Sequence, residues 1–250
     1  MVILLSGLLA IPSLAWAGSG GGSLGPSGGG STGAGGSTAQ SGNVTVSASG
    51  DGITLTTDAS AMLRLGLSFS GTASSSEAGQ TIEIERLGHE TNWQWTPTVT
   101  ATVASDGSFS AVWSTNHIGR FSIRAVIAGA SAGAAAAPPQ LTTTVYRQSL
   151  ATIYGPGFYG KRTACGVKLT RSTIGLASRT LRCGEHVSVY YQGRTLSVPV
   201  IDRGPYANGA DWDLTTATAR ALGMDGTATV GAVSLPLEPS AGVTPPSAAG

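Results

Sequence analysis

Two aspartates near the end of the chain give the clearest chemical signal in the sequence. Asp202 follows an apolar run that is typical of a buried strand, and a rigid Arg-Gly-Pro turn comes directly after it. Asp213 lies further along, just before a short helical pattern, and Tyr206 lies between the two acids. Carboxylates that strand ends place beside aromatic side chains are typical of sites that handle sugars. The run from Val198 to Thr215 therefore predicts a glycan site.

Each aspartate has a functional and a structural interpretation. A carboxyl group at the end of an apolar strand is partly desolvated, so Asp202 could hold a proton near neutral pH and act as a general acid towards a glycosidic oxygen. Alternatively, Asp202 only holds the turn at Arg203 through backbone hydrogen bonds. Asp213 could be the N-cap of the following helix, could line the groove, or could do both, because a capping carboxylate keeps one oxygen free.

A glycine-rich loop with aromatic residues lies upstream. Residues 155–160 spell Gly-Pro-Gly-Phe-Tyr-Gly, which has the letter spacing of a dinucleotide-binding fingerprint. No helical pattern follows it and no βαβ unit surrounds it, so we interpret it as a tight loop that presents Tyr154, Phe158 and Tyr159. These aromatic side chains either line a groove, where they stack on sugar rings, or pack in a core.

These motifs resemble the RlpA family, whose members carry a double-psi β-barrel, related to expansin-like barrels, and act on bacterial peptidoglycan. The likeness extends over about residues 150–236, through segments 151–160, 162–166, 179–181 and 198–223. The resemblance implies a lytic transglycosylase that cleaves the bond between N-acetylmuramic acid and N-acetylglucosamine and leaves a 1,6-anhydro product. Asp202 would be its catalytic acid and base, and no cofactor or metal is expected.

The side chains around Asp202 are expected to bind the substrate. Asp213 and Tyr206 would position the glycan, and two arginines would give electrostatic support. The full set of expected substrate-binding residues is Asp213, Tyr206, Arg203, Arg179, Tyr154 and Tyr159.

Two positions depart from the pattern of the lytic members. Those members carry a Glu after the Thr-Ala-x-Gly motif and a His before Arg-Thr-Leu, whereas this chain has Val167 and Ser178. Glu185 and His186 lie nearby in the sequence, but nothing places them at these positions, and we expect His186 to be solvated. The departures leave a second function open, a non-catalytic, expansin-like module that binds glycan or loosens the wall.

Composition and patterning divide the chain into five segments. Residues 1–17 predict a signal peptide that ends in Ala-Trp-Ala, 18–42 a Gly/Ser-rich flexible linker, 43–147 an immunoglobulin-like β-sandwich, 148–236 a six-stranded double-psi β-barrel with a short helix, and 237–250 a disordered Pro/Ala tail. Export places Cys165 and Cys183 in an oxidising compartment, which favours a disulfide between them. A zinc site is not expected, because two Cys and three scattered His give no ligand cluster at zinc spacing.

The predicted sandwich rests on short alternating strands separated by the turn dipeptides Asp51-Gly52 and Asp106-Gly107. Trp113 and Phe121 are its expected core residues. We expect the last strand of the sandwich at 141–146 and a separate first strand of the barrel at 151–154. We also expect a barrel helix over 215–222 that Gly223 ends.

Trp93 and Trp95 are expected to share one face of an extended segment. We interpret them as core residues of the sandwich, because large aromatic side chains dominate cores. The alternative is a platform on which sugar rings stack.

The charge pattern limits the possible partners. The net charge is +1 and only 11% of residues are charged, with no basic cluster, so nucleic acid binding is not expected. We expect a monomer in the cell envelope or outside the cell that has peptidoglycan glycan strands as its partner and no membrane contact after signal cleavage.

Overall fold

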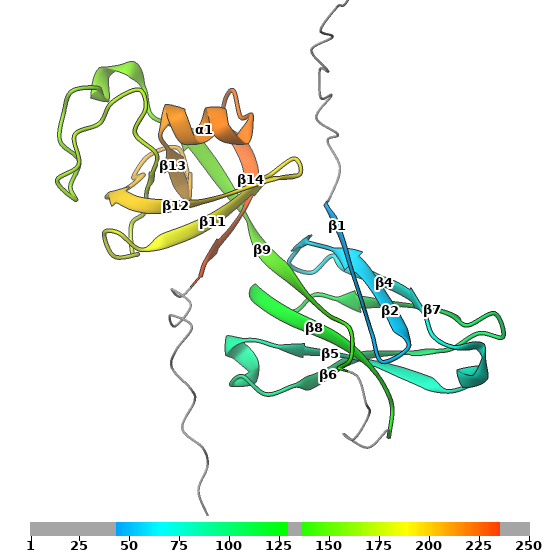
Figure 1. Cartoon of the computed structure of the whole chain (residues 1–250). Helices are drawn as coiled ribbons and strands as arrows, with labels where there is room; N and C mark the ends of the chain where they lie inside the picture. The colour runs from blue at the N-terminus through cyan, green and yellow to red at the C-terminus, as the bar shows by residue number, and fades with distance from the viewer. Residues whose placement is uncertain (1–43, 130–136, 236–250) are drawn as a thin grey trace, which may run out of the picture. The chain divides into compact units, whose positions relative to one another are not determined.

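The computed structural model describes residues 44–129 and 137–235, whose regular secondary structure is mainly β-strand (Figure 1). The predicted signal peptide (1–17), linker (18–42) and tail (237–250) lie outside the described residues. Within the described ranges, no helix has the length and apolar character needed to cross a membrane.

The N-terminal part is a sandwich of two sheets. One antiparallel sheet has the order β1-β2-β4-β7, with β1 at Thr45–Gly50, β2 at Ile53–Asp58, β4 at Gly66–Thr72 and β7 at Ser108–Ser114. The other has the order β9-β8-β5-β6, with β9 at Gln140–Ile153, β8 at Gly119–Ile127, β5 at Thr81–Leu87 and β6 at Thr96–Thr102; β3 at Ser60–Met62 pairs with β9. Two short 3-10 helices, η1 at Ser75–Glu77 and η2 at His89–Thr91, lie in its loops.

Alternating apolar side chains from both sheets fill the space between them. Trp113 from β7 and Phe121 from β8 are buried and meet edge to face, with ring centroids 5.8 Å apart. Both residues are the core residues that the sequence predicted, and the immunoglobulin-like sandwich is confirmed. Of the two turn dipeptides, Asp51-Gly52 has left-handed φ values of 46° and 71°, as a type I′ hairpin requires. At Asp106-Gly107 only the glycine has a positive φ, 84°, so that turn is of another type.

The prediction that Trp93 and Trp95 pack in the core is wrong. The segment is a turn, because Asn92 and Trp93 both have left-handed backbone conformations, with φ of 51° and 58°. The Trp93 side chain is 51% exposed. Trp95 is half-buried, and the central carbon of the Arg124 guanidinium lies over its ring, 4.3 Å from the ring centroid.

Strand β9 continues from the sandwich into the barrel, where the sequence predicted two separate strands. Its first half pairs with β8, from Gln140 to Val145, and the following residues from Arg147 to Ala151 pair with β14. No glycine or proline interrupts this stretch. The chain therefore stays extended, because each half has a partner strand.

The C-terminal part is a closed barrel of six strands. The strands follow the order β13-β10-β12-β11-β14-β9, and β13 pairs with β9 to close the barrel. The new strands are β10 at Leu176–Ala177, β11 at His186–Tyr191, β12 at Arg194–Asp202, β13 at Trp212–Leu214 and β14 at Ala228–Ser234, with a 3-10 turn, η3, at Pro156–Phe158. Its core is mainly aliphatic and includes Val187, Val189, Val198 and Leu214.

The helix of the barrel, α1, spans Thr216–Leu222. Thr215 is its N-cap, and the Thr215 hydroxyl accepts a hydrogen bond from the Thr218 amide. Gly223 ends the helix with a left-handed φ of 76°, as predicted. Asp213 does not cap the helix, because it belongs to strand β13.

Candidate active site

Strand pairing brings the two aspartates to the same end of the barrel. Asp202 is the last residue of β12 and Asp213 is the middle residue of β13, and both strands flank β10. Ala177 of β10 is in register with Asp202 on one side and with Asp213 on the other. Two strand spacings of about 4.8 Å place their Cα atoms roughly 10 Å apart. The two carboxylates therefore lie within reach of one substrate.

The Asp202 carboxylate accepts hydrogen bonds from three separate segments. Its Oδ2 accepts from the Tyr154 hydroxyl at 2.8 Å, and its Oδ1 accepts from the Ala164 amide at 2.7 Å and from the Arg203 amide at 2.8 Å. The structure thus contains the turn-holding bond to Arg203 that the sequence suggested as an alternative. It also connects Asp202 to the end of β9 and to the loop around Ala164, and three donors directed at one carboxylate suit an anion.

Tyr154 is buried, with an exposed fraction of 6%, and packs in a small core with Leu169, Ala177 and Ile201. Burial raises the pKa of the Tyr154 phenol, and the hydrogen bond to Asp202 and the charges of both aspartates raise it further. The phenol therefore stays protonated and donates to Asp202 at neutral pH. The Tyr154 ring therefore packs mainly in a core, the second of the two environments that the sequence left open.

Asp213 has a different environment from Asp202. Its Oδ1 accepts one side-chain hydrogen bond, from the Thr152 hydroxyl of β9 at 2.8 Å. Burial raises the pKa of the Asp213 carboxyl; the Thr152 bond lowers this pKa in part, and the charge of Asp202 raises it again. Asp213 therefore retains a proton to higher pH than an exposed aspartate does. The sequence did not indicate Thr152, because only the pairing of β13 with β9 places it there.

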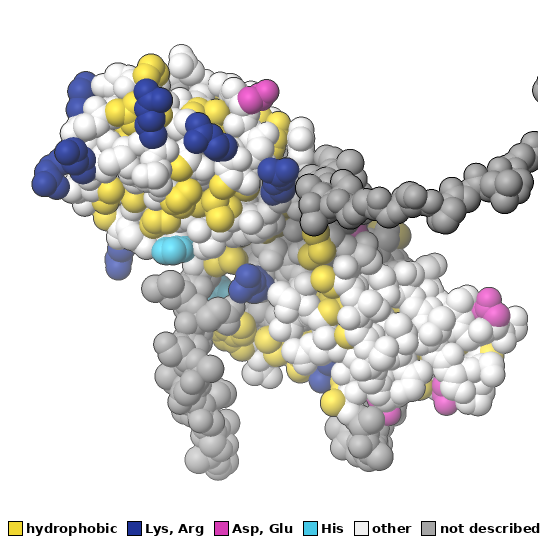
Figure 2. Space-filling model, turned by 45° about the horizontal axis from the view of Figure 1, so that its top comes forward, with side chains coloured by type: hydrophobic (Ala, Val, Ile, Leu, Met, Phe, Trp, Pro, Cys, Tyr) yellow, Lys and Arg dark blue, Asp and Glu magenta, His cyan; other side chains and the backbone are white. Residues whose placement is uncertain are grey.

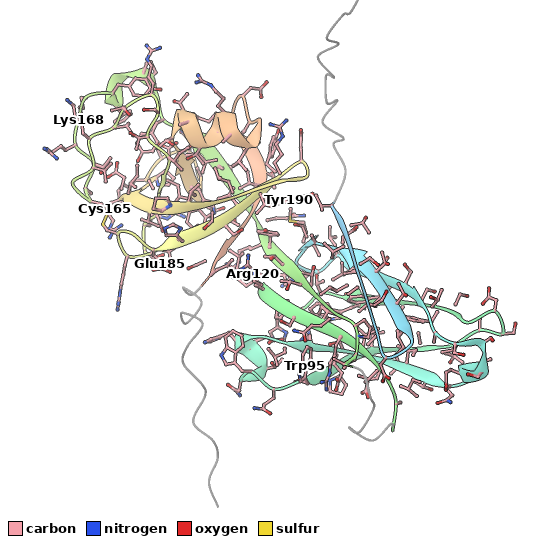
Figure 3. All side chains as sticks on the ribbon, viewed as in Figure 1. Trp95, Arg120, Cys165, Lys168, Glu185 and Tyr190 are labelled. Atoms are coloured by element: carbon pink, nitrogen blue, oxygen red, sulfur yellow. A yellow bond between two sulfur atoms is a disulfide. The ribbon has the colours of Figure 1, made fainter. Side chains whose placement is uncertain are left out.

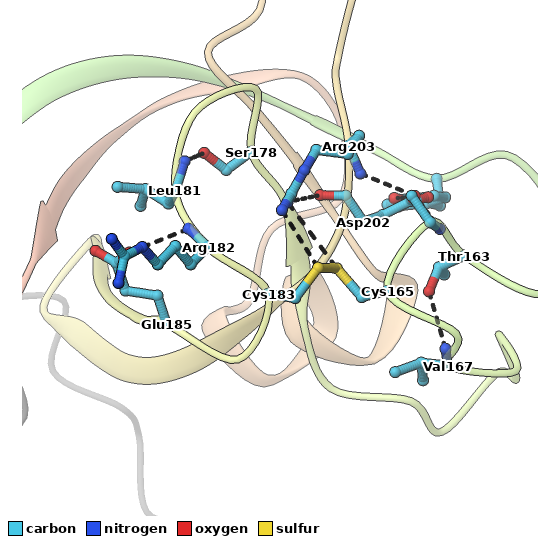
Figure 4. Close-up of a disulfide and its surroundings, with 12 residues drawn as sticks. Thr163, Cys165, Val167, Ser178, Leu181, Arg182, Cys183, Glu185, Asp202 and Arg203 are labelled. Atoms are coloured by element: carbon cyan, nitrogen blue, oxygen red, sulfur yellow. Dashed lines mark hydrogen bonds between the residues drawn. A yellow bond between two sulfur atoms is a disulfide. The ribbon is translucent and has the colours of Figure 1, made fainter.

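The predicted disulfide between Cys165 and Cys183 is present, with Cα atoms 5.7 Å apart. Figure 4 shows the Arg203 guanidinium directed at the two sulfur atoms. Its Nη2 lies 3.3 Å from Cys183 Sγ and its Nη1 lies 3.9 Å from Cys165 Sγ. Arg203 therefore braces the loop that carries the disulfide against the end of β12, beside the Asp202 carboxylate.

Arg179 holds the loop that follows Asp202. Its Nη1 donates to the carbonyl oxygens of Pro205 and Ala210, at 2.9 and 2.7 Å, and its Nη2 lies 3.5 Å from the Asp211 carboxylate. Tyr206, at the tip of this loop, is 79% exposed. Arg179 thus fixes a loop that presents an aromatic ring to solvent, and its bonds explain its position without a ligand.

A cavity of about 850 Å³ lies next to the aspartates. Neither aspartate lines it, but Thr152 and Tyr154, which donate to Asp213 and Asp202, both do. Tyr159 also lines the cavity, and its hydroxyl lies 2.5 Å from that of Thr216 at the start of α1. The cavity is within the size range of small-molecule sites and reaches the carboxylate partners from the helix side.

Cationic side chains accompany the aromatic residues of this loop. Lys161 lies 5.6 Å from the ring centroid of Phe158, and Arg171 lies 5.5 Å from that of Tyr159. Phe158 is 51% exposed. Lys and Arg side chains are also conspicuous over the barrel in Figure 2. This side of the barrel therefore offers both flat apolar rings and positive charge.

The positions of the family's Glu and His are structural in this chain. Val167 packs against the small core that contains Tyr154. Ser178 is buried, and its hydroxyl accepts hydrogen bonds from the amides of Thr180 and Leu181. Figure 4 shows Val167 and Ser178 on opposite sides of the disulfide. Among the described residues, no group of three or more His, Cys, Asp and Glu side chains could hold a metal.

Glu185 and His186 do not take over these positions. Glu185 accepts hydrogen bonds from the Ser234 hydroxyl and the Arg182 amide, and it thereby holds a turn and the end of β14. His186 Nδ1 lies 3.2 Å from the Ser197 hydroxyl of the neighbouring strand. Both side chains therefore have local partners of their own.

The C-terminal part has the closed six-stranded barrel, the acid at a strand end and the short helix that we expected of a double-psi β-barrel, and the comparisons agree. Residues 147–236 match the model of the family described as "Lytic transglycolase". The chain is 40% identical over 77 residues to a Synechocystis protein named "Probable endolytic peptidoglycan transglycosylase RlpA", covering 30% of this chain and 24% of that protein. A protein of the same name from Aquifex aeolicus is 38% identical over 81 residues, covering 32% and 36%.

The C-terminal part is therefore an RlpA-like domain, as the sequence motifs predicted, and the matched region spans 24% and 36% of the length of these two relatives. Two solved structures also show some similarity. The Streptomyces papain inhibitor is 28% identical, covering 34% of this chain and 92% of that chain, with a TM-score of 0.26. The ectodomain of the teleost fish polymeric Ig receptor is 11% identical, covering 70% and 82%, also with a TM-score of 0.26.

Proposed function

We propose that the barrel domain acts on peptidoglycan glycan strands outside the cytoplasm as an RlpA-type lytic transglycosylase. The observation that supports this best is the pair of carboxylates, Asp202 and Asp213, on the two strands that flank Ala177. The aromatic and cationic side chains beside them, and the similarity to proteins named endolytic peptidoglycan transglycosylases, support the same function.

The two environments suit two roles in one reaction. A lytic transglycosylase breaks the bond between C1 of the muramic sugar and the glycosidic oxygen, while the C6 hydroxyl of the same sugar bonds to C1. The leaving oxygen needs a proton and the C6 hydroxyl must lose one. Asp213, whose pKa burial raises, gives the proton to the leaving oxygen. Asp202, the acceptor of three hydrogen bonds, takes the proton from the C6 hydroxyl.

Product analysis tests this function and separates the two roles. The protein is incubated with peptidoglycan and with glycan strands stripped of their stem peptides, and mass spectrometry measures 1,6-anhydromuramic products. We expect such products from the wild type and their loss from both Asp202→Asn and Asp213→Asn. If Asp202 acts as acid and base alone, as the sequence predicted, Asp213→Asn retains substantial activity.

The control is Asp51→Asn in the sandwich, because Asn-Gly suits the same type I′ turn as Asp-Gly. This variant should form products at the wild-type rate. Reducing-end products without the anhydro mass would identify a hydrolase and would overturn the proposal.

A non-catalytic glycan-binding module is the second candidate. The structural roles of Val167 and Ser178 favour it, because the chain lacks two polar groups that lytic members of the family use. This function predicts that the protein sediments with insoluble peptidoglycan and forms no product. In that case Asp202→Asn would weaken sedimentation without changing any reaction.

A further inference from the structure

Trp93 is exposed in a backbone conformation that bulky residues rarely adopt. Its φ is 58°, that of the preceding Asn92 is 51°, and half of its side chain meets solvent. A left-handed conformation at a large aromatic residue costs free energy, and such strain is concentrated at functional sites. Neither the core of the sandwich nor the barrel site explains why the chain holds an indole ring in this position.

Hydrogen bonds fix the loop that carries this ring. The Trp93 amide donates to the Gly88 carbonyl at 3.0 Å, and the Thr91 hydroxyl bridges the amide and carbonyl of the same Gly88 at 3.0 Å each. An ion pair between Arg86 and Glu90, at 2.6 Å, closes the base of the loop. The backbone that carries the indole is therefore fixed in advance, and a ligand that stacks on the ring does not have to order the loop.

A hollow of about 440 Å³ lies beside the ring, on the outer face of the sheet that contains β5, β8 and β9. Leu87, Ser122 and Thr142 are in register across these three strands and form its floor. Arg120, two residues before Ser122 on β8, completes the lining and is labelled with Trp95 in Figure 3. We call this hollow the Trp93 pocket.

The lining matches the chemistry of a sugar ring. The apolar face of a pyranose stacks on an indole, and its hydroxyl groups need donors and acceptors at the edge of that contact. Ser122 and Thr142 supply hydroxyl groups that both donate and accept. The volume is within the range of small-ligand sites.

We propose that the Trp93 pocket is a carbohydrate-binding site that takes one pyranose ring of a β-1,4-linked amino-sugar strand. The choice of an amino-sugar strand rests on the proposed function, whereas the site itself is separate from the barrel aspartates and does not require the barrel to be catalytic. If the barrel cleaves the same strand, a second contact on the sandwich raises the effective concentration of substrate at the barrel.

Titration of the full chain with the β-1,4-linked tetramer of N-acetylglucosamine tests this site. This probe offers no muramic sugar for the barrel to cleave. We expect binding by calorimetry, with a change in tryptophan fluorescence. Trp93→Ala should weaken binding at least about tenfold, and Thr142→Val should weaken it less.

Trp95→Ala is the matched control, because Trp95 belongs to the same loop but stacks on Arg124 and does not line the pocket. It should retain wild-type affinity.

Absence of tetramer binding by the wild type, or equal affinity of Trp93→Ala and the wild type, would overturn the inference. Loss of tetramer binding in the double variant Asp202→Asn, Asp213→Asn, together with wild-type affinity in Trp93→Ala, would place the site in the barrel instead. Anhydro products from peptidoglycan together with no tetramer binding would leave the transglycosylase proposal standing and refute only the Trp93 pocket.

Discussion

Asp202 contributes to stability, because it holds three segments together at the end of the barrel, and it also belongs to the proposed catalytic site. Two substitutions separate its effect on stability from its effect on the reaction. Asp202→Ala removes the acceptor of three hydrogen bonds. The Tyr154 hydroxyl belongs to a buried residue and the Arg203 amide is partly buried, so neither can turn freely to water. The Ala164 amide is exposed and can be hydrated.

The expected loss of stability follows from this count. A sheltered donor without a partner costs about 1–3 kcal/mol, so two of them lower the free energy of unfolding of Asp202→Ala by about 4 kcal/mol. In Asp202→Asn the amide oxygen still accepts from both backbone amides, and the Tyr154 hydroxyl can rotate to accept from the new amino group. Only the charge assistance is lost, about 1 kcal/mol per sheltered bond, which gives about 2 kcal/mol.

Urea denaturation, monitored by tryptophan fluorescence and far-UV circular dichroism, measures both values by linear extrapolation. We expect Asp202→Ala to be less stable than Asp202→Asn by about 2 kcal/mol. If Asp202→Ala unfolds within about 0.5 kcal/mol of the wild type, the carboxylate does not hold the three segments together and the reasoning is refuted. Because Asp202→Asn keeps the fold, its loss of anhydro products would then report on chemistry.

Three further predictions concern the disulfide, the second aspartate and the helix cap. Replacing Cys165 and Cys183 by Ser should lower the free energy of unfolding by about 3 kcal/mol, because the disulfide closes a loop with a sequence separation of 18. Reducing agent should then shift the urea midpoint of the wild type and leave that of the variant unchanged. The pKa of Asp213 is raised in the folded state, whereas in the unfolded chain it is about 4. The free energy of unfolding therefore falls as the pH rises above about 4, because the folded state then has to ionise a group that it holds better in the protonated form. Asp213→Asn should therefore gain stability relative to the wild type between pH 4 and pH 7, and an equal difference at both pH values would contradict this. Thr215→Ala should lower the free energy of unfolding by about 1–2 kcal/mol, because it removes the hydroxyl that accepts a hydrogen bond from the Thr218 amide. Thr215→Ser keeps a hydroxyl and should retain most of this stability, and thermal unfolding of the two variants measures the difference.

The sequence by itself determined the features that depend on local pattern. An apolar run that ends in Asp202 predicts a strand that delivers a carboxylate, and Gly223 predicts the end of α1 because only glycine adopts a left-handed cap without strain. The order of several motifs identified the RlpA-like barrel, and two cysteines in a chain predicted to be exported indicated their pairing. Each of these signals depends only on residue types and their order along the chain.

Tertiary structure alone decided which side chains meet and which are exposed. Strand pairing places Asp213 across β10 from Asp202 and beside Thr152, and this register is set by partner strands far away in the sequence. Burial of Tyr154 and exposure of Trp93 were decided in the same way, because an aromatic residue in a loop can face a core or solvent with the same local sequence. Packing against distant strands selects one of these environments.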